Sequence, residues 1–309
     1  MLAMRDRLRR FLPIIAAVLL LAGCGLVVAA VSGAFDGAAG GRVHDPAPAA
    51  ASRLHVDRFD QGRAWTDLRH QVRMGPRPAG SDASRRLAGW IRARLPRGRF
   101  ETVPGGLRNV VGSLPGRKPA VVIGAHYDTK RMSGFVGAED GAGGTAELLG
   151  LARALRHVQR PAGAPALRFV FFDGEESPDD SRDFYATGLR GSKAYARAHA
   201  RELRAMVLLD FVAQANLSIP RETGSDPALW SRLRAAARRV GAARAFPGGT
   251  TGEILDDHTP FSRRGVPAID LIDFSYPCWH RTCDDLAHVS EHSLDLTGET
   301  MLELLRSWR

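Results

Sequence analysis

Two kinds of apolar pattern recur along the chain, and they predict two kinds of element. Apolar residues repeat at helical spacing in four stretches, at residues 87–95, 148–155, 227–240 and 301–308. Short, almost wholly apolar runs lie between them, at residues 120–124, 167–172, 206–209 and 268–272. Runs of this length and apolarity are typical of strands that are buried on both faces of a sheet.

Strands that alternate with helices in this way predict an α/β fold. We expect a single globular domain over residues 56–309, with a central, mixed but mostly parallel twisted sheet flanked by helices. The chain has 309 residues, which is enough for one large domain with a sizeable core. An N-terminal apolar helix is expected to precede this domain.

Residues 1–35 have the pattern of an export or anchoring segment. Four arginines lie within residues 5–10, and the uncharged apolar run at residues 11–35 is long enough to cross a membrane. We interpret the segment as a signal anchor or as a lipoprotein signal through Cys24, and favour both over a cleaved signal that releases the protein. Residues 36–55 are rich in Ala, Gly and Pro and are predicted to be a linker. Each alternative exports the globular domain from the cytoplasm.

The net charge of +10 does not by itself indicate a binding partner. Only three of the 43 basic residues are lysines, and the arginines are scattered rather than gathered in one stripe. Nucleic-acid-binding proteins concentrate their positive charge, often with interleaved aromatic residues, so no nucleic-acid partner is expected. We expect a membrane contact through the N-terminal segment instead.

Polar side chains follow three of the predicted strands. His126 comes directly after the first strand, the pair Glu175 and Glu176 comes just after the second, and Asp210 directly follows the third. In a parallel sheet the carboxyl ends of the strands lie at one edge, where ligands usually bind. We therefore expect these four side chains to lie close together.

Two more residues join this predicted cluster. Asp140 lies in the glycine-rich run at residues 137–144, and His280 follows the last predicted strand. Several carboxylates in one cleft repel each other, and a divalent cation relieves that repulsion. Mixed histidine and carboxylate ligands favour zinc over calcium or magnesium. The predicted zinc ligands are His126, Asp140, Glu176, Asp210 and His280.

The adjacent acids Glu175 and Glu176 indicate two different roles. Neighbouring side chains do not easily reach one ion, so one of them can bind the metal while the other serves as general acid and base. Asp128, two positions after His126, is expected to hold the imidazole of that histidine from behind.

Together these motifs resemble the zinc aminopeptidase superfamily, which is M28-like and includes co-catalytic-zinc aminopeptidases and glutaminyl cyclases. The resemblance rests on His-Tyr-Asp-Thr at residues 126–129, the run at 137–144, Phe-Phe-Asp-Gly-Glu-Glu at 171–176, and His280. It extends over roughly residues 60–309.

Three features are closer to the glutaminyl cyclases than to the aminopeptidases. Asp-Asp-His-Thr-Pro-Phe at residues 256–261 is similar to a cyclase signature, whereas the aminopeptidases usually have Ser or Thr in place of Asp256. Leu-Leu-Asp at residues 208–210 and Trp279 directly before the histidine are also similar to the cyclases.

The resemblance implies a metal set. Carried over by position, Asp140, Glu176 and His280 would hold one zinc ion. His126 and Asp210 are also present, so the complete ligand set of a two-zinc peptidase exists in the chain. We expect one zinc and leave a second open.

The resemblance also implies an activity, the closure of an N-terminal glutamine of peptides or proteins to pyroglutamate with release of ammonia. Glu175 would be the catalytic proton shuttle, Asp210 and Asp256 its supporting acids, and Trp279 a wall of the substrate pocket. The alternatives are a two-metal zinc aminopeptidase and an inactive binding module, although the intact Glu175 argues against the module.

Two further features keep alternatives open. Cys278 and Cys283 flank His280 and can form a disulfide in an oxidising compartment, although thiolate coordination or unpaired thiols are alternatives. His258 can orient Asp256 or donate to a backbone carbonyl.

Overall fold

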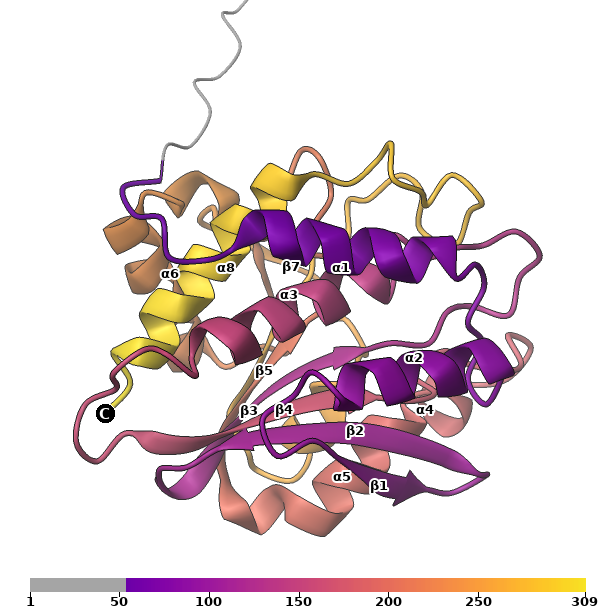
Figure 1. Ribbon diagram of the computed structural model, residues 1–309, viewed down its shortest axis with the longest axis horizontal. Coiled ribbons are helices and arrows are strands. Elements are labelled where there is room, and N and C mark those ends of the chain that lie inside the picture. Colours follow the sequence, from indigo (N-terminus) through magenta and orange to yellow (C-terminus); the bar gives the residue numbers. More distant parts are fainter. Residues whose placement is uncertain (1–53) are drawn as a thin grey trace, which may run out of the picture. The chain divides into compact units, whose positions relative to one another are not determined.

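In the computed structural model, which describes residues 54–309, the chain forms one α/β domain around a six-stranded sheet (Figure 1). The order across the sheet is β1-β2-β4-β3-β5-β8. The bounds are β1 Arg99–Val103, β2 Leu107–Leu114, β3 Arg117–His126, β4 Pro165–Phe172, β5 Leu203–Leu209 and β8 Ala268–Leu271. A separate parallel pair is formed by β6 Arg221–Glu222 and β7 Thr250–Thr251.

The sheet is mixed, as predicted. Strands β4, β3, β5 and β8 run parallel, while β1 and β2 add an antiparallel hairpin to the β4 edge. The four predicted strands correspond to the four parallel strands. The hairpin was not predicted, because most residues of β1 are at least partly exposed and its sequence therefore lacks an apolar run.

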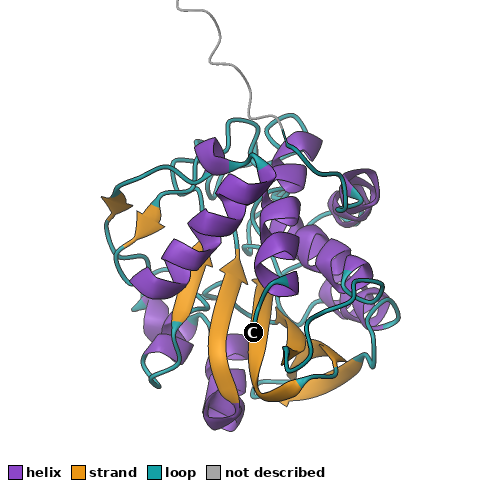
Figure 2. Cartoon of the chain, turned by 90° about the vertical axis from the view of Figure 1, so that its left-hand side faces the viewer, coloured by secondary structure: helices purple, strands orange, loops and turns teal. Residues whose placement is uncertain are grey.

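Helices cover both faces of the sheet (Figures 1 and 2). The described α-helices are α1 Gln61–Arg73, α2 Asp82–Arg92, α3 Ala142–Ala154, α4 Phe184–Thr187, α5 Arg190–His199, α6 Pro227–Val240, α7 Thr259–Ser262 and α8 Glu291–Arg306. Helices α1, α2, α3, α6 and α8 share one apolar core with one face of the sheet, and α5 and α7 pack on the other face. Alternate residues of β3 supply the two cores: Val121 and Ile123 point to the first, Val122 to the second.

The predicted helices are confirmed, with local signals that act as expected. Asp226 caps α6 by accepting a hydrogen bond from the backbone N–H of Leu229, Pro227 occupies the first turn, and Gly241 ends the helix in a left-handed conformation. Helix α1 was not predicted, because its sequence is largely polar and only four of its residues are buried.

The glycine-rich run brings α3 against the end of β5. A Cβ atom on Gly144 would lie 2.0 Å from the carbonyl oxygen of Leu209, so only glycine permits this approach. Gly141, with φ of +96°, precedes the first turn of α3. The residue before it, Asp140, is thereby placed at the same edge as Asp210, which directly follows β5.

The predicted N-terminal helix and the linker up to residue 53 lie outside the described residues. Within residues 54–309, no helix combines the length and apolarity that a membrane crossing requires.

Candidate active site

A cavity of about 550 Å³ opens beside the carboxyl ends of β4, β5 and β8. Its wall holds Lys130, His280 and the aromatic residues Phe184, Phe211, Phe274 and Trp279. It also holds seven carboxylates, namely Asp140, Glu175, Glu176, Asp180, Asp210, Glu253 and Asp256. Such an excess of acids in one cleft attracts cationic groups.

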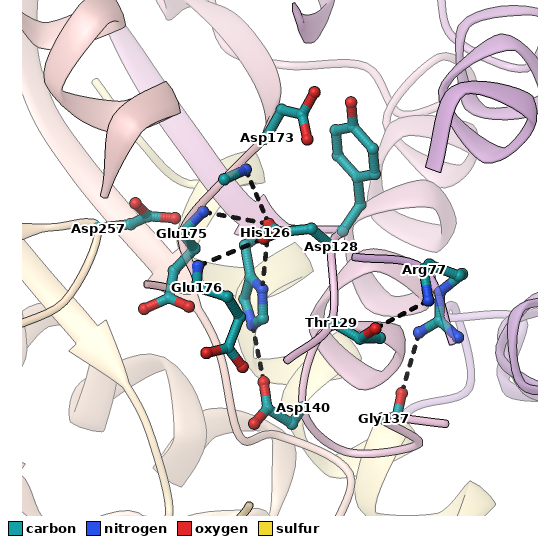
Figure 3. Close-up of polar contacts among 12 residues, drawn as sticks. Arg77, His126, Asp128, Thr129, Gly137, Asp140, Asp173, Glu175, Glu176 and Asp257 are labelled. Carbon is teal, nitrogen blue, oxygen red and sulfur yellow. Dashed lines mark hydrogen bonds and ion pairs between the residues drawn. The ribbon is translucent and has the colours of Figure 1, made fainter. Parts of the chain in front are cut away.

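Two groups of ligating atoms meet in this cavity, and they share Asp140 (Figure 3 shows Asp140 with His126). In the first group, Nε2 of His126 lies 3.3 Å from Oδ1 of Asp140 and 3.1 Å from Oδ1 of Asp210. In the second, Nε2 of His280 lies 3.7 Å from Oδ2 of Asp140 and 3.4 Å from Oε1 of Glu176. All five predicted ligands therefore come together.

These distances fit metal binding. Two ligand atoms at zinc-bond length from one tetrahedral ion lie about 3.3 Å apart. Oε1 of Glu176 is buried and has no hydrogen-bond partner within the described part of the chain, although it faces His280. Burial alone would lower the pKa of His126, but the carboxylates of Asp128, Asp140 and Asp210 raise it well above its usual value. The carboxylates of the site thus stabilise a positive charge at the place where the ligand atoms meet.

The carboxylate of Asp128 faces His126 as expected, but its hydrogen bonds go elsewhere. Strand β3 ends at His126, and Oδ1 of Asp128 lies 3.8 Å from Nδ1 of the imidazole, too far for a hydrogen bond. The carboxylate instead accepts hydrogen bonds from the backbone N–H groups of Gly174, Glu175 and Glu176 at 3.0, 3.1 and 3.3 Å (Figure 3). Asp128 therefore fixes the turn that carries the two glutamates.

Glu175 and Glu176 face different surroundings, in agreement with two roles. Glu176 lies beside His280 and within 3.5 Å of the Lys130 ammonium, whereas Glu175 has no ion pair within the described residues and lines the open cavity. Burial, and then the negative charge of Glu176, raise the pKa of Glu175 well above the usual value of a carboxyl group.

The loop with His280 is closed by a disulfide between Cys278 and Cys283. His280 itself has a φ of +51°, a left-handed conformation that a non-glycine residue adopts only when its surroundings impose it. Its ring stacks on Trp279 with the centroids 4.5 Å apart. Trp279 is 45% exposed and lies at the cavity wall, where it was predicted.

Asp284, which was not predicted, joins the two loops that carry the predicted metal ligands Asp140 and His280. Its carboxylate accepts hydrogen bonds from the backbone N–H groups of Glu139 (2.8 Å) and Asp140 (3.1 Å) and from the Tyr276 hydroxyl (2.8 Å). Burial, and then the charge of Asp140, raise the pKa of Asp284 to about 6. The only hint in the sequence is an acidic pair directly after Cys283.

Arg77 secures the same region from the other side. It is fully buried, and its guanidinium donates to the carbonyl oxygen of Gly137 at 3.1 Å (Figure 3) and to that of Val136 at 2.8 Å, both just before Asp140. Burial lowers the pKa of Arg77 to about 10. No role was predicted for Arg77, and its contacts with the loop of Asp140 were not anticipated.

His258 has two carboxylate neighbours that the sequence did not indicate. Its imidazole lies between two buried carboxylates, with Nε2 3.5 Å from Oε1 of Glu222 and Nδ1 3.6 Å from Oδ2 of Asp270. Asp256 is 3% exposed and reaches the cavity wall. Burial, and then the charge of Asp256, raise the pKa of both Asp210 and Asp270. A row of buried acids therefore extends from the metal ligands into the protein.

An α/β sheet with paired carboxylate and imidazole groups beyond its parallel strands has the architecture of a metal-dependent exopeptidase. Peptidase family M28 matches residues 109–305, so the chain belongs to that family.

The relatives within this family are chiefly cyclases. Glutaminyl-peptide cyclotransferase of Bos taurus is 32% identical over 61% of this chain, and the match spans 61% of that relative's own length. A glutaminyl cyclase of an Acidobacteriales bacterium is 30% identical, with a TM-score of 0.70 over 84% of this chain and 98% of that chain. A leucine aminopeptidase precursor of Bacteroides thetaiotaomicron has a TM-score of 0.72 over 83% of this chain and all of that chain, and its 24% identity supports the fold alone.

Proposed function

We propose that the chain is a zinc-dependent glutaminyl-peptide cyclotransferase that converts N-terminal glutamine of peptides or proteins to pyroglutamate. The observation that carries this proposal is the buried carboxylate of Asp256, which lines the same cavity as Glu175 and the ligand groups. The aminopeptidases that the chain resembles usually have Ser or Thr there. The cyclases among the relatives support the same choice.

The reaction needs one bond to form and one to break. The α-nitrogen of the substrate attacks the γ-carboxamide carbon, the C–N bond to the amide nitrogen breaks, and ammonia leaves. Asp140, Glu176 and His280 would hold the zinc ion, which when bound polarises the amide carbonyl and stabilises the negative charge on its oxygen.

The side chains of the protein have separate tasks. Glu175 accepts the proton of the attacking amine and returns it to the leaving nitrogen, which is general acid and base catalysis by one group. Asp210 and Asp256 are buried acids that support Glu175 and hold the α-amine of the substrate. Trp279 forms the wall that keeps the γ-amide close to the α-amine, and this proximity replaces a bimolecular encounter.

A second candidate is a two-metal aminopeptidase. It is favoured by the group of His126, Asp140 and Asp210, which lies in place beside the other group. In that function Glu175 would activate a water molecule, and Asp140 would be shared by two ions.

We propose that the protein acts outside the cytoplasm, attached to a membrane through its N-terminal segment. The disulfide between Cys278 and Cys283 supports an oxidising compartment.

One experiment separates the two activities. The full chain, supplied with zinc, is incubated with a pair of peptides that differ only in an N-terminal Gln or Leu, and the products are read by mass spectrometry. Loss of ammonia from the Gln peptide, with the Leu peptide intact, is the expected result. Release of free Leu or Gln would instead establish the aminopeptidase and overturn the proposal.

A further inference from the structure

A second cavity, of about 470 Å³, adjoins the catalytic one. The two share four wall residues, namely Glu253, Ile254, Ile272 and Phe274. The rest of the second wall comes from Ser218, Pro220, Thr251, Gly252, Asp273 and Ser275. We call this second cavity the outer groove. Because the two cavities share these wall residues, a peptide that leaves the catalytic cavity on this side enters the outer groove directly.

Phe274 stands where the two cavities meet. Its ring is 45% exposed and is held from one side by Phe211, with centroids 6.1 Å apart, and from the other by Trp279 at 4.8 Å. Such an exposed but supported aromatic ring offers a flat apolar surface for a peptide to cross.

The outer groove contains one carboxylate that the protein does not use. Glu253 is exposed, and it has no ion-pair partner among residues 54–309. The other acid of the groove, Asp273, is buried, and its oxygens accept hydrogen bonds from the backbone N–H groups of Ser218 and Ser275 and from the Ser275 hydroxyl. Across the catalytic cavity, Asp180 is already paired with Lys130 at 2.5 Å. Negative charge is therefore available to a ligand on the side of Glu253.

We propose that the outer groove binds the residues that follow the N-terminal glutamine of the substrate, and that Glu253 selects a lysine or arginine among them. The inference rests on the proposed function, since the terminal residue must occupy the catalytic cavity for its amine to reach Glu175. The later residues then leave over Phe274, and a basic side chain in the groove lies beside Glu253.

The test uses the full chain and pentapeptides that begin with Gln. The parent peptide has Ala at positions 2 to 5, and each of the others has Lys or Glu at one of these positions. The rate of ammonia release gives kcat/KM. We expect Lys to exceed Glu by about three- to fivefold at one or two neighbouring positions, the size of an exposed ion pair. Glu253→Lys should invert this order. Asp57→Lys, which makes the same charge change at an exposed residue that lines neither cavity, should leave it as it is.

Two results would overturn the proposed role of the outer groove. One is an equal preference for Lys at every position, and the other is a preference for Lys that survives in Glu253→Lys. Calorimetric binding of peptides that begin with pyroglutamate tests the groove separately from the cyclase activity. The peptides carry Lys or Glu at the position preferred in the rate assay. If no peptide is cyclised, Lys and Glu are compared at each of positions 2 to 5. Absence of cyclisation together with a Glu253-dependent preference for Lys in binding overturns the cyclase and supports the groove. Cyclisation without any charge preference overturns the groove and leaves the cyclase standing.

Discussion

Two regions of this protein bury carboxylates equally deeply and do different things with them. At the sheet edge, Asp140 and Glu176 converge with imidazoles on an open cavity. Between α3 and α8, Glu147 is fully buried, and neither of its oxygens has a hydrogen-bond partner in the described part of the chain. Burial raises the pKa of Glu147 well above its usual value, and the charges of Asp295 and Glu299 add to the shift.

The comparison shows that burial and a raised pKa do not by themselves mark a functional site. Glu175, although only half-buried, shares with Glu147 a pKa that its surroundings raise well above the usual value of a carboxyl group. What distinguishes the sheet edge is that ligating atoms of different chemical kinds come within a few ångströms of one another and open onto a cavity of about 550 Å³. Four experiments, with five variants, can break or sharpen this contrast.

The largest effect is expected for Glu175→Gln, which removes the proton shuttle and keeps its shape. The rate of pyroglutamate formation should fall by about 10²- to 10⁴-fold, and the melting temperature should not decrease. Mass spectrometry of the peptide product and thermal unfolding followed by circular dichroism measure the two quantities. An active variant would show that Glu175 resembles Glu147 and has no catalytic task.

Replacement of His280 and of His126 should have different effects on metal content and activity if a single zinc ion carries out the chemistry. His280→Ala should lose the catalytic metal and most of the activity, by about 10²-fold or more. His126→Ala should keep one zinc per chain and much of the activity. Elemental analysis of the dialysed proteins, alongside the peptide assay, gives both numbers. Equal losses in both variants would indicate a two-metal site instead.

Asp284→Asn tests a residue that touches neither metal nor substrate. Its carboxylate positions the backbone of Glu139 and Asp140, so the variant should bind zinc about 10- to 100-fold more weakly. Competition with a chelator measures the affinity. At saturating zinc the activity should recover, and a permanent loss would contradict a purely positioning role.

Glu147→Gln should change stability alone. Burial disfavours the ionised form of Glu147, and glutamine has no ionised form. Each unit by which the pKa is raised corresponds to about 1.4 kcal/mol, so the variant should unfold at higher denaturant concentration at neutral pH, with unchanged peptide turnover. Folding raises the pKa of Glu147, so above about pH 4.3 the folded state retains a proton that the unfolded state has released. The free energy of unfolding of the natural protein should therefore fall relative to the variant as the pH rises above that value. A difference that does not depend on pH would show that Glu147 is ionised in the fold.

The sequence predicts the ligands better than the residues that hold them in place. His126, Glu176 and Asp210 could be found because each follows an apolar run, and parallel strands bring their carboxyl ends to one edge. Asp284 and Arg77 could not, because they act through backbone groups of loops that are distant in the sequence.

The same reason explains why further contacts of Asp128 and His258 were not predicted. Proximity in the sequence favoured His126 and Asp256 as their partners. The fold also brings to them, from elsewhere in the sequence, the turn after β4 for Asp128 and the carboxylates of Glu222 and Asp270 for His258.

The disulfide between Cys278 and Cys283 encloses both Trp279 and His280. One wall of the cavity and one metal ligand therefore belong to a single small covalent ring. This ring can be closed only by an oxidant, whereas the rest of the site needs only folding and a metal ion. Completion of this ring therefore depends on the redox environment of the protein as well as on folding and metal binding.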